Sequence, residues 1–181
     1  KFGENVLAET NNYELVITHK EDLNGLPGDV ISRAAELAKQ SDKKDCWIFN
    51  LQAPSYIPFM ENARNRSLRE QLYRAYMQKA FKGDDFDNQA LVKSIVLLRA
   101  ELAQILGYPT YATYVLEERM ANDPKTVMDF LDDLLVKAER QAEREVEELK
   151  GFMVSLGVDH ELQRWDWAYY SEKLRKQKYD F

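Results

Sequence analysis

The chain has 181 residues, of which 45% are hydrophobic and 31% charged, and its formal net charge is −6 at pH 7. This length suits one medium domain with a sizeable core, and the apolar content excludes an intrinsically disordered chain. No stretch approaches the ~20 consecutive apolar residues that a transmembrane helix needs, and a negative charge disfavours the phosphate backbone as main partner. We therefore expect neither a membrane nor a nucleic acid as partner.

Residues 1–53 predict a helix, a strand, a second helix and a second strand. An amphipathic helix opens the chain and ends near Asn11 and Asn12, which favour turns. Residues 13–18 and 45–51 have the β-branched and aromatic content of short strands. Between them, Pro27 suits a first helical position, and apolar residues follow at helical spacing from Val30 to Ala38.

Residues 54–181 predict helices only, and the first is short. The segment 56–63 suits a helix in which Pro58 is tolerated only near the start, and Ser67 is a candidate N-cap for the next helix. The turn-forming sequence 83–85 ends that helix.

Four further helical patterns follow. Residues 91–106 carry a wide apolar stripe, centred on Leu98 and closed by Gly107, so we expect this helix to be the most buried. A helix over 110–120 comes next, and Asp123-Pro124 opens a long one that ends at Gly157. Asp166 is a candidate cap for the last helix. The predicted fold class is mainly α, a multi-helix segment with a small two-stranded β element near the N-terminus. We treat residues 1–181 as one unit with a 1–53 portion and a helical 54–181 portion.

Catalytic and metal-binding motifs are not visible in the residues themselves. Cys46, the only cysteine, lies in an apolar run and is interpreted as a core residue rather than a reactive thiol. The histidines are His19 and His160, and neither has a second histidine four residues on, as a His-Glu-x-x-His zinc site requires. The residues predict no catalytic and no metal site. Arg66, Arg69 and Arg74 suit binding to carboxylates, either within the fold or on a ligand, and the sequence leaves both alternatives open.

Several segments resemble one known family, and they occur in the same order along the chain. They are residues 1–7, 53–60, 65–76 with Asn65-Arg66 and Arg69, 98–108, and 165–174 with Trp165-Asp166 and Tyr169-Tyr170. Together they resemble the thimet oligopeptidase family of zinc metallopeptidases, in its bacterial oligopeptidase A and peptidyl-dipeptidase branch. We interpret Arg66, Arg69, Trp165, Asp166, Tyr169 and Tyr170 as family-signature residues of unknown role.

The resemblance implies a largely helical peptidase with a channel for short peptides and a zinc ion held by a His-Glu-x-x-His helix. No zinc ligand or catalytic residue can be placed on this sequence, so the chain is expected to be a fragment upstream of the zinc helix. Its expected partners are short peptide substrates and the rest of the parent chain, with zinc bound outside this segment.

Two hypotheses of function follow. In the first, the segment forms a wall of the substrate channel of an oligopeptidase or peptidyl-dipeptidase and is inactive alone. In the alternative, it is a non-catalytic helical protein-interaction module. The lone cysteine favours the cytoplasm, and a parent with an upstream signal peptide would instead be periplasmic. Internal cleavage and release of dipeptides are not distinguished by these residues.

Overall fold

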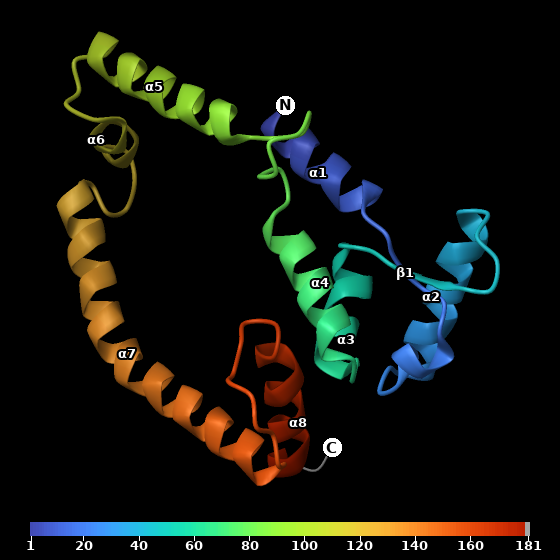
Figure 1. Cartoon of the computed structure of the whole chain (residues 1–181). Helices are drawn as coiled ribbons and strands as arrows, with labels where there is room; N and C mark the ends of the chain where they lie inside the picture. The colour runs from blue at the N-terminus through green and yellow to red at the C-terminus, as the bar shows by residue number, and fades with distance from the viewer. Residues whose placement is uncertain (180–181) are drawn as a thin grey trace. The chain divides into compact units, whose positions relative to one another are not determined.

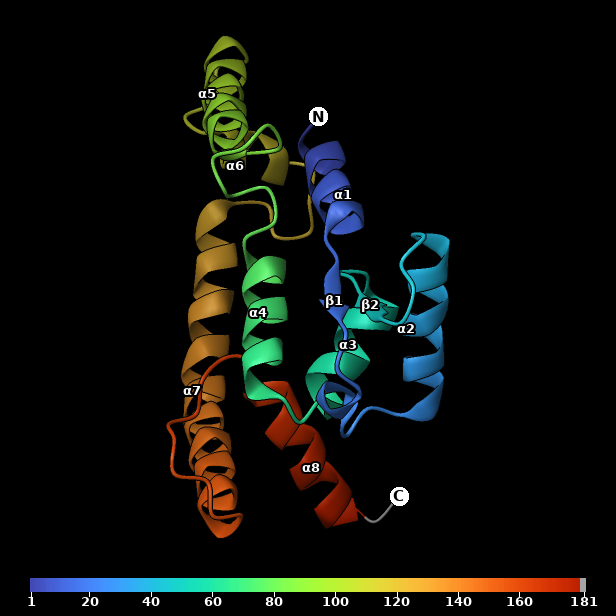
Figure 2. The same ribbon diagram turned by 45° about the vertical axis from the view of Figure 1, so that its right-hand side comes forward.

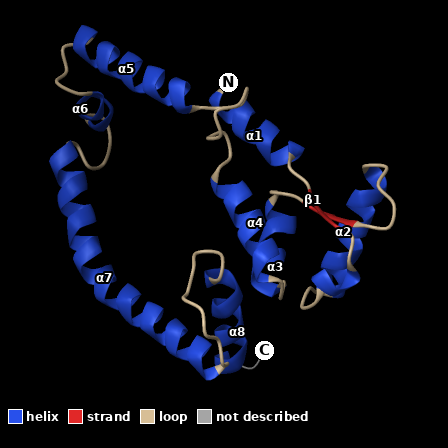
Figure 3. Cartoon of the chain, in the orientation of Figure 1, coloured by secondary structure: helices blue, strands red, loops and turns tan. Residues whose placement is uncertain are grey.

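The computed structural model describes residues 1–179, which form eight α-helices, one short 3₁₀ helix and a two-stranded sheet (Figures 1 and 3). The expected fold class, mainly α with a small β element near the N-terminus, is confirmed. Among these residues, no helix is both long and apolar enough to cross a lipid bilayer. The contacts divide the chain into two compact units, one made of residues 1–87 with the segment from residue 149 onward, and one made of residues 88–148.

The first unit begins with α1 (Phe2–Asn12), β1 (Leu15–Ile17), the 3₁₀ helix η1 (Lys20–Leu23), α2 (Gly28–Gln40) and β2 (Trp47–Phe49). The strands pair antiparallel, with Leu15 opposite Phe49 and Ile17 opposite Trp47. Leu15 and Ile17 are buried while Val16 between them is exposed, because successive side chains of a strand point to opposite faces. Helix α2 packs on β2. The predicted order of helix, strand, helix and strand is therefore confirmed, with strands shorter than predicted.

The same unit continues through α3 (Ala53–Asn62) and α4 (Arg66–Met77), and it includes α8 (Trp167–Tyr179) and the end of α7 (Pro124–Ser155). Helix α8 packs along α3, although about a hundred residues separate them in the sequence (Figure 2). The main hydrophobic core lies here, between the sheet and helices α2, α3 and α4, and its fully buried members include Phe49, Phe59 and Leu72.

Two details of this unit differ from the sequence analysis. Pro58 lies in the middle of α3, six residues into a ten-residue helix, not near its start. Proline has no backbone N–H, so the helix loses one hydrogen bond at this position. The next residue, Phe59, is completely buried in the core, and this packing offsets the lost hydrogen bond. The N-cap of α4 is Asn65, not Ser67.

We expect Asn65→Ala to lower the free energy of unfolding by about 1 kcal/mol. The side-chain oxygen Oδ1 of Asn65 accepts a hydrogen bond from the backbone N–H of Leu68 at 3.2 Å, and its side-chain Nδ2 donates to Oδ1 of Asp22 at 2.7 Å. Urea denaturation followed by circular dichroism measures the change. Ser67→Ala is the matched control and should change stability by less than about 0.5 kcal/mol. A larger loss for Ser67→Ala than for Asn65→Ala would restore Ser67 as the cap.

The second unit contains α5 (Gln89–Ile105), α6 (Tyr111–Leu116) and α7 as far as residue 148. The expected helix boundaries are confirmed at Gly107, whose φ is +80°, and at Asp123, whose carboxylate accepts from the N–H of Thr126 at 2.9 Å. The expectation that α5 is the most buried helix is wrong. Only Ala103 of its residues is buried, and Leu98 is 64% exposed. The apolar stripe exists, and most of its side chains are exposed.

Candidate functional site

Asp166 lies immediately before α8, and its side chain is completely buried. Its backbone carbonyl accepts the hydrogen bond from the Tyr170 N–H that begins the helix, as the predicted cap position requires. Its carboxylate accepts instead from the Gln163 N–H at 3.2 Å, which closes the preceding turn. A buried carboxylate needs opposite charge, since an isolated ion in a low-dielectric interior costs several kcal/mol.

That charge comes from α4. Arg66 donates from Nε to Oδ1 of Asp166 at 3.0 Å and from Nη2 to Oδ2 at 2.8 Å, a two-point contact that suits the planar guanidinium. Arg69 donates from Nη2 to Oδ1 at 2.9 Å. The two arginines are one helical turn apart, so both reach one carboxylate from the same face of α4.

Arg69 is the most buried charged side chain of this cluster after Asp166, with 1% of its surface exposed. Its Nη1 donates to the backbone carbonyls of Ala63 at 2.7 Å and Arg64 at 3.2 Å, and its Nε donates to that of Trp165 at 3.3 Å. Its guanidinium also lies over the Tyr169 ring, 4.1 Å from the centroid. One side chain therefore ties the end of α3 to the start of α8.

Aromatic rings complete the cluster. The Trp165 ring lies beneath two guanidinium groups, Arg66 at 5.5 Å and Arg74 at 4.9 Å from its centroid. Tyr169 and Tyr170 meet edge to face, with centroids 5.1 Å apart. Cations over aromatic faces stabilise such contacts by about 0.5–2 kcal/mol each, most where water is excluded.

The electrostatics keep Asp166 ionised. Burial raises the pKa of its carboxyl, but the hydrogen bonds from Arg66, Arg69 and the Gln163 N–H outweigh burial and lower the pKa below its ordinary 3.8. The hydrogen bond to Asp166 raises the pKa of the Arg66 guanidinium. A general acid at neutral pH needs a raised pKa, so this carboxylate does not suit proton donation. The cluster suits positioning of α8 against α3 and α4.

This charge state predicts an acid-dependent loss of stability. Because the folded pKa of Asp166 lies below its unfolded value, its contribution is complete above about pH 4 and is lost as pH falls through the folded pKa. Urea midpoints measured from pH 5 to pH 2 should therefore fall more steeply for the wild-type chain than for Asp166→Asn. Glu172, whose pKa is lowered to about 2 by hydrogen bonds from Arg175 and Lys176 that outweigh its burial, titrates in the same window and remains in both proteins. Equal slopes would contradict the role assigned to Asp166.

The structure brings together the residues that the sequence analysis singled out. Arg66, Arg69, Trp165, Asp166 and Tyr169 share direct contacts, and Tyr170 joins through Tyr169. The arginines bind a carboxylate within the fold, which decides the alternative that the sequence left open for Arg66 and Arg69. Arg74 pairs with Glu70 at 2.8 Å and faces Trp165. The sequence analysis missed Gln163 and the carbonyls of Ala63 and Arg64, because backbone groups carry no sequence signal.

The described residues do not fit a zinc ion. Within residues 1–179, no three His, Cys, Asp or Glu side chains converge as metal ligands. His19 lies just before η1, and His160 lies in the loop between α7 and α8, where its ring faces Tyr170 with centroids 6.4 Å apart. Neither histidine belongs to the arginine–aspartate cluster.

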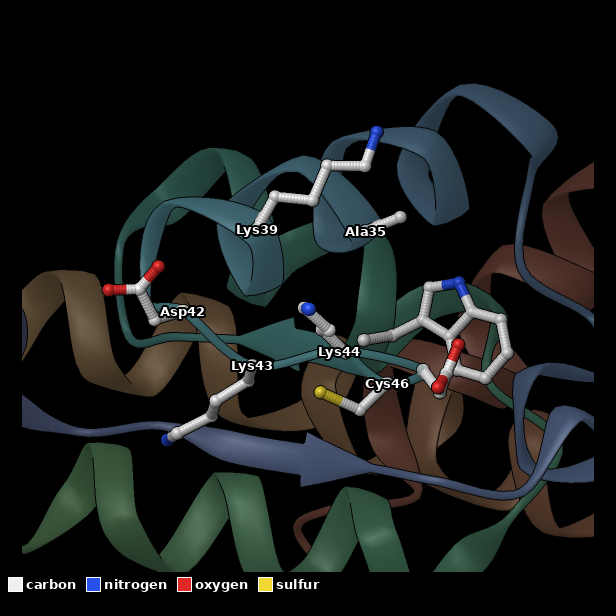
Figure 4. A pocket seen from close by; sticks show the side chains of 8 residues that line it. Ala35, Lys39, Asp42, Lys43, Lys44 and Cys46 are labelled. Atoms are coloured by element: carbon white, nitrogen blue, oxygen red, sulfur yellow. The ribbon is translucent and has the colours of Figure 1, made fainter.

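Cys46 is buried, as predicted, and packs with Ala38 and Ile48. It lies beside a 610 Å³ cavity where the end of α2 meets β2, with Lys39, Lys43 and Lys44 around the opening (Figure 4). Lys43 and Lys39 are paired with Glu14 and Glu36. None of the residues that line this cavity belongs to the cluster at Asp166.

The sequence of residues 59–181 matches the profile of Peptidase family M3. The chain belongs to this family. It is 38% identical to the organellar oligopeptidase A of Arabidopsis thaliana and 38% identical to oligopeptidase A of Escherichia coli, in each case over 99% of this chain. It is 29% identical to dipeptidyl carboxypeptidase of E. coli, again over 99% of the chain. The M3 relatives are longer, since the chain spans about a quarter of their length, 24% and 27% for the two oligopeptidases.

Family M3 membership confirms the resemblance on which the sequence analysis relied. The segments that carried it lie in both units of this chain, and residues 65–76 and 165–174 hold the arginine–aspartate cluster. In this M3 chain the two signature segments are thus neighbours in space. Their shared contact gives a physical reason for the types of residue found there: a buried carboxylate, two arginines that neutralise it, and aromatic faces beneath the guanidinium groups.

Proposed function

We propose that this chain is a segment of a zinc-dependent M3 peptidase that hydrolyses short peptides, and that it forms a wall of the substrate channel. The observation that carries the proposal is its match, over 99% of its length, to oligopeptidases from a bacterium and a plant. Residues 1–181 act together in this proposal as one helical segment of the larger enzyme. The 38% identity favours an oligopeptidase over the alternative of a non-catalytic interaction module.

In this proposal, zinc is bound outside the segment, and the segment alone has no peptidase activity. Two features support this division. The 181 residues contain no His-Glu-x-x-His sequence, and residues 1–179 offer no three converging metal ligands. A catalytic zinc site needs three protein ligands and an open position for water, so polypeptide beyond the quarter that this chain matches must supply them.

The arginine–aspartate cluster gives the wall its rigidity. It fixes the start of α8 to α3 and α4 through contacts from Arg66 and Arg69 to one buried carboxylate. Peptide substrates are bound productively only when the surrounding groups hold their places within about 0.5 Å. Arg66, Arg69, Trp165, Asp166, Tyr169 and Tyr170 are therefore positioning residues in this proposal, and none of them reacts with the substrate. We also propose a cytoplasmic location, since the single cysteine forms no intrachain disulfide of the kind that oxidising compartments favour.

A chimaeric enzyme tests the proposal. The stretch of E. coli oligopeptidase A that matches this chain is replaced by residues 1–181, and hydrolysis of a short quenched peptide is measured with and without a chelator. We expect chelator-sensitive hydrolysis by the chimaera and none by the isolated chain. A folded chimaera that binds zinc but cleaves no peptide would contradict the proposal, and so would chelator-sensitive cleavage by the isolated chain. In the first case the interaction module becomes the better hypothesis.

A further inference from the structure

The second unit, residues 88–148, has almost no interior of its own. Only Asn88 and Ala103 are buried among these residues, and the three hydrophobic core clusters all lie in the other unit. Exposed apolar side chains are concentrated instead on α5 and the first half of α7. They are Val92, Val96, Leu97, Leu98, Leu102, Ile105 and Leu106, followed by Met128, Phe130, Leu131, Leu134, Leu135 and Val136. A soluble monomer rarely exposes more than a few hundred Å² of contiguous apolar surface.

The direction of the apolar residues around α5 decides what kind of partner fits. At about 100° per residue, Leu98 and Val96 lie about 160° apart around the helix axis. Both are exposed, at 64% and 59%. One flat partner covers a stripe about 100° wide, the width of the apolar face of an ordinary surface helix. A second copy of this chain, packed symmetrically on α5, would cover one of these two residues and leave the other in water.

We infer that α5 is an interior helix of the complete peptidase, enclosed on more than one face by the three quarters of the M3 polypeptide that the relatives have in addition to this segment. This inference rests on the proposed function. The surface of this chain that the partner covers consists of α5 together with the exposed apolar face of α7 before residue 149. The occupant presents apolar side chains on at least two elements, because only several elements can surround a helix whose apolar residues span half of its circumference. The side of α5 that carries Lys93 and Gln104 remains in water, and Leu97, about 40° from Lys93 around the helix axis, is not part of the enclosed surface.

Cysteine labelling tests the inference without disrupting the fold. Leu98→Cys and Val96→Cys are made in the isolated chain and in the chimaera with oligopeptidase A, and the rate of maleimide labelling is compared with that of each protein without the added cysteine. Lys93→Cys on the polar side of α5 is the matched control. We expect both apolar positions to label freely in the isolated chain and at least about tenfold more slowly in the chimaera, whereas position 93 labels at similar rates in both.

An active chimaera in which positions 96 and 98 label freely would overturn the inference and leave the proposed function standing. Protection of both positions in a folded but inactive chimaera would support the enclosed helix and contradict the peptidase role. Protection of one position only would mean that the partner covers a single face of α5, which would contradict the inferred enclosure on more than one face. A stable dimer of the isolated chain that protects both positions, seen by light scattering at the same concentration, would make the second copy the occupant and overturn the inference.

Discussion

Replacing Asp166 with alanine is expected to lower the free energy of unfolding by about 3–5 kcal/mol. The substitution leaves Arg69 with 1% of its surface exposed and no carboxylate to neutralise it. An uncompensated charge in a buried position costs more than the lost hydrogen bonds alone, because the guanidinium keeps its desolvation penalty without its ionic partner. Arg66, one third exposed, can turn its charge toward water.

The measurement is urea denaturation at pH 7, followed by circular dichroism and by tryptophan fluorescence, to which Trp165 beside the cluster contributes. Asp133→Ala is the matched control. Asp133 is 62% exposed and pairs with Lys137 at 2.5 Å on α7, so its loss should cost less than about 0.5 kcal/mol. If Asp166→Ala cost no more than Asp133→Ala, the buried cluster would not hold α8 in place, and the positioning role proposed for it would have to be abandoned.

The local parts of this fold were predictable because they depend on residues close in sequence. Gly107 and Gly157 adopt positive φ at the ends of α5 and α7, a conformation that glycine adopts without strain. The helix predicted over 110–120 begins where expected, with Thr110 as its cap accepting from the Thr113 N–H at 3.1 Å, but it ends earlier, at Leu116. The error at α4 has the same local origin. Asn65 and Ser67 are both good cap residues, and the choice between them depends on the amide of Asn65 reaching Asp22, a contact across 43 residues.

The long-range parts were not predictable from one sequence. The pattern of arginines at 66 and 69 predicts two cations on one face of a helix, but nothing in it identifies a carboxylate a hundred residues later as their partner. Resemblance to a family marked both segments as important, and only the structure shows that they touch. The stripe on α5 illustrates the opposite case, because a helical period predicts which side chains share a face but not what covers that face.

Leu72→Ala and Leu98→Ala remove the same atoms from a buried and from an exposed side chain. Leu72→Ala is expected to have the second large effect on the free energy of unfolding. Leu72 on α4 is completely buried in the main core, so its truncation leaves a cavity and should cost about 2–5 kcal/mol. Leu98→Ala on α5 removes the same atoms from a side chain that is 64% exposed, and in the isolated chain it should cost less than about 0.5 kcal/mol. Each exchanges leucine for alanine inside a helix, so the small difference in helix propensity is common to both.

Urea denaturation of the isolated chain measures both substitutions, at a concentration where light scattering shows a monomer. A loss above about 2 kcal/mol for Leu98→Ala would mean that α5 is covered in the isolated chain, by the chain itself if it is still a monomer. In the chimaera the comparison changes, because a helix enclosed by the rest of an M3 peptidase should make Leu98→Ala nearly as costly as Leu72→Ala. The cost of Leu98→Ala in the chimaera minus its cost in the isolated chain therefore measures the stabilisation that the enclosing polypeptide gives through the Leu98 side chain.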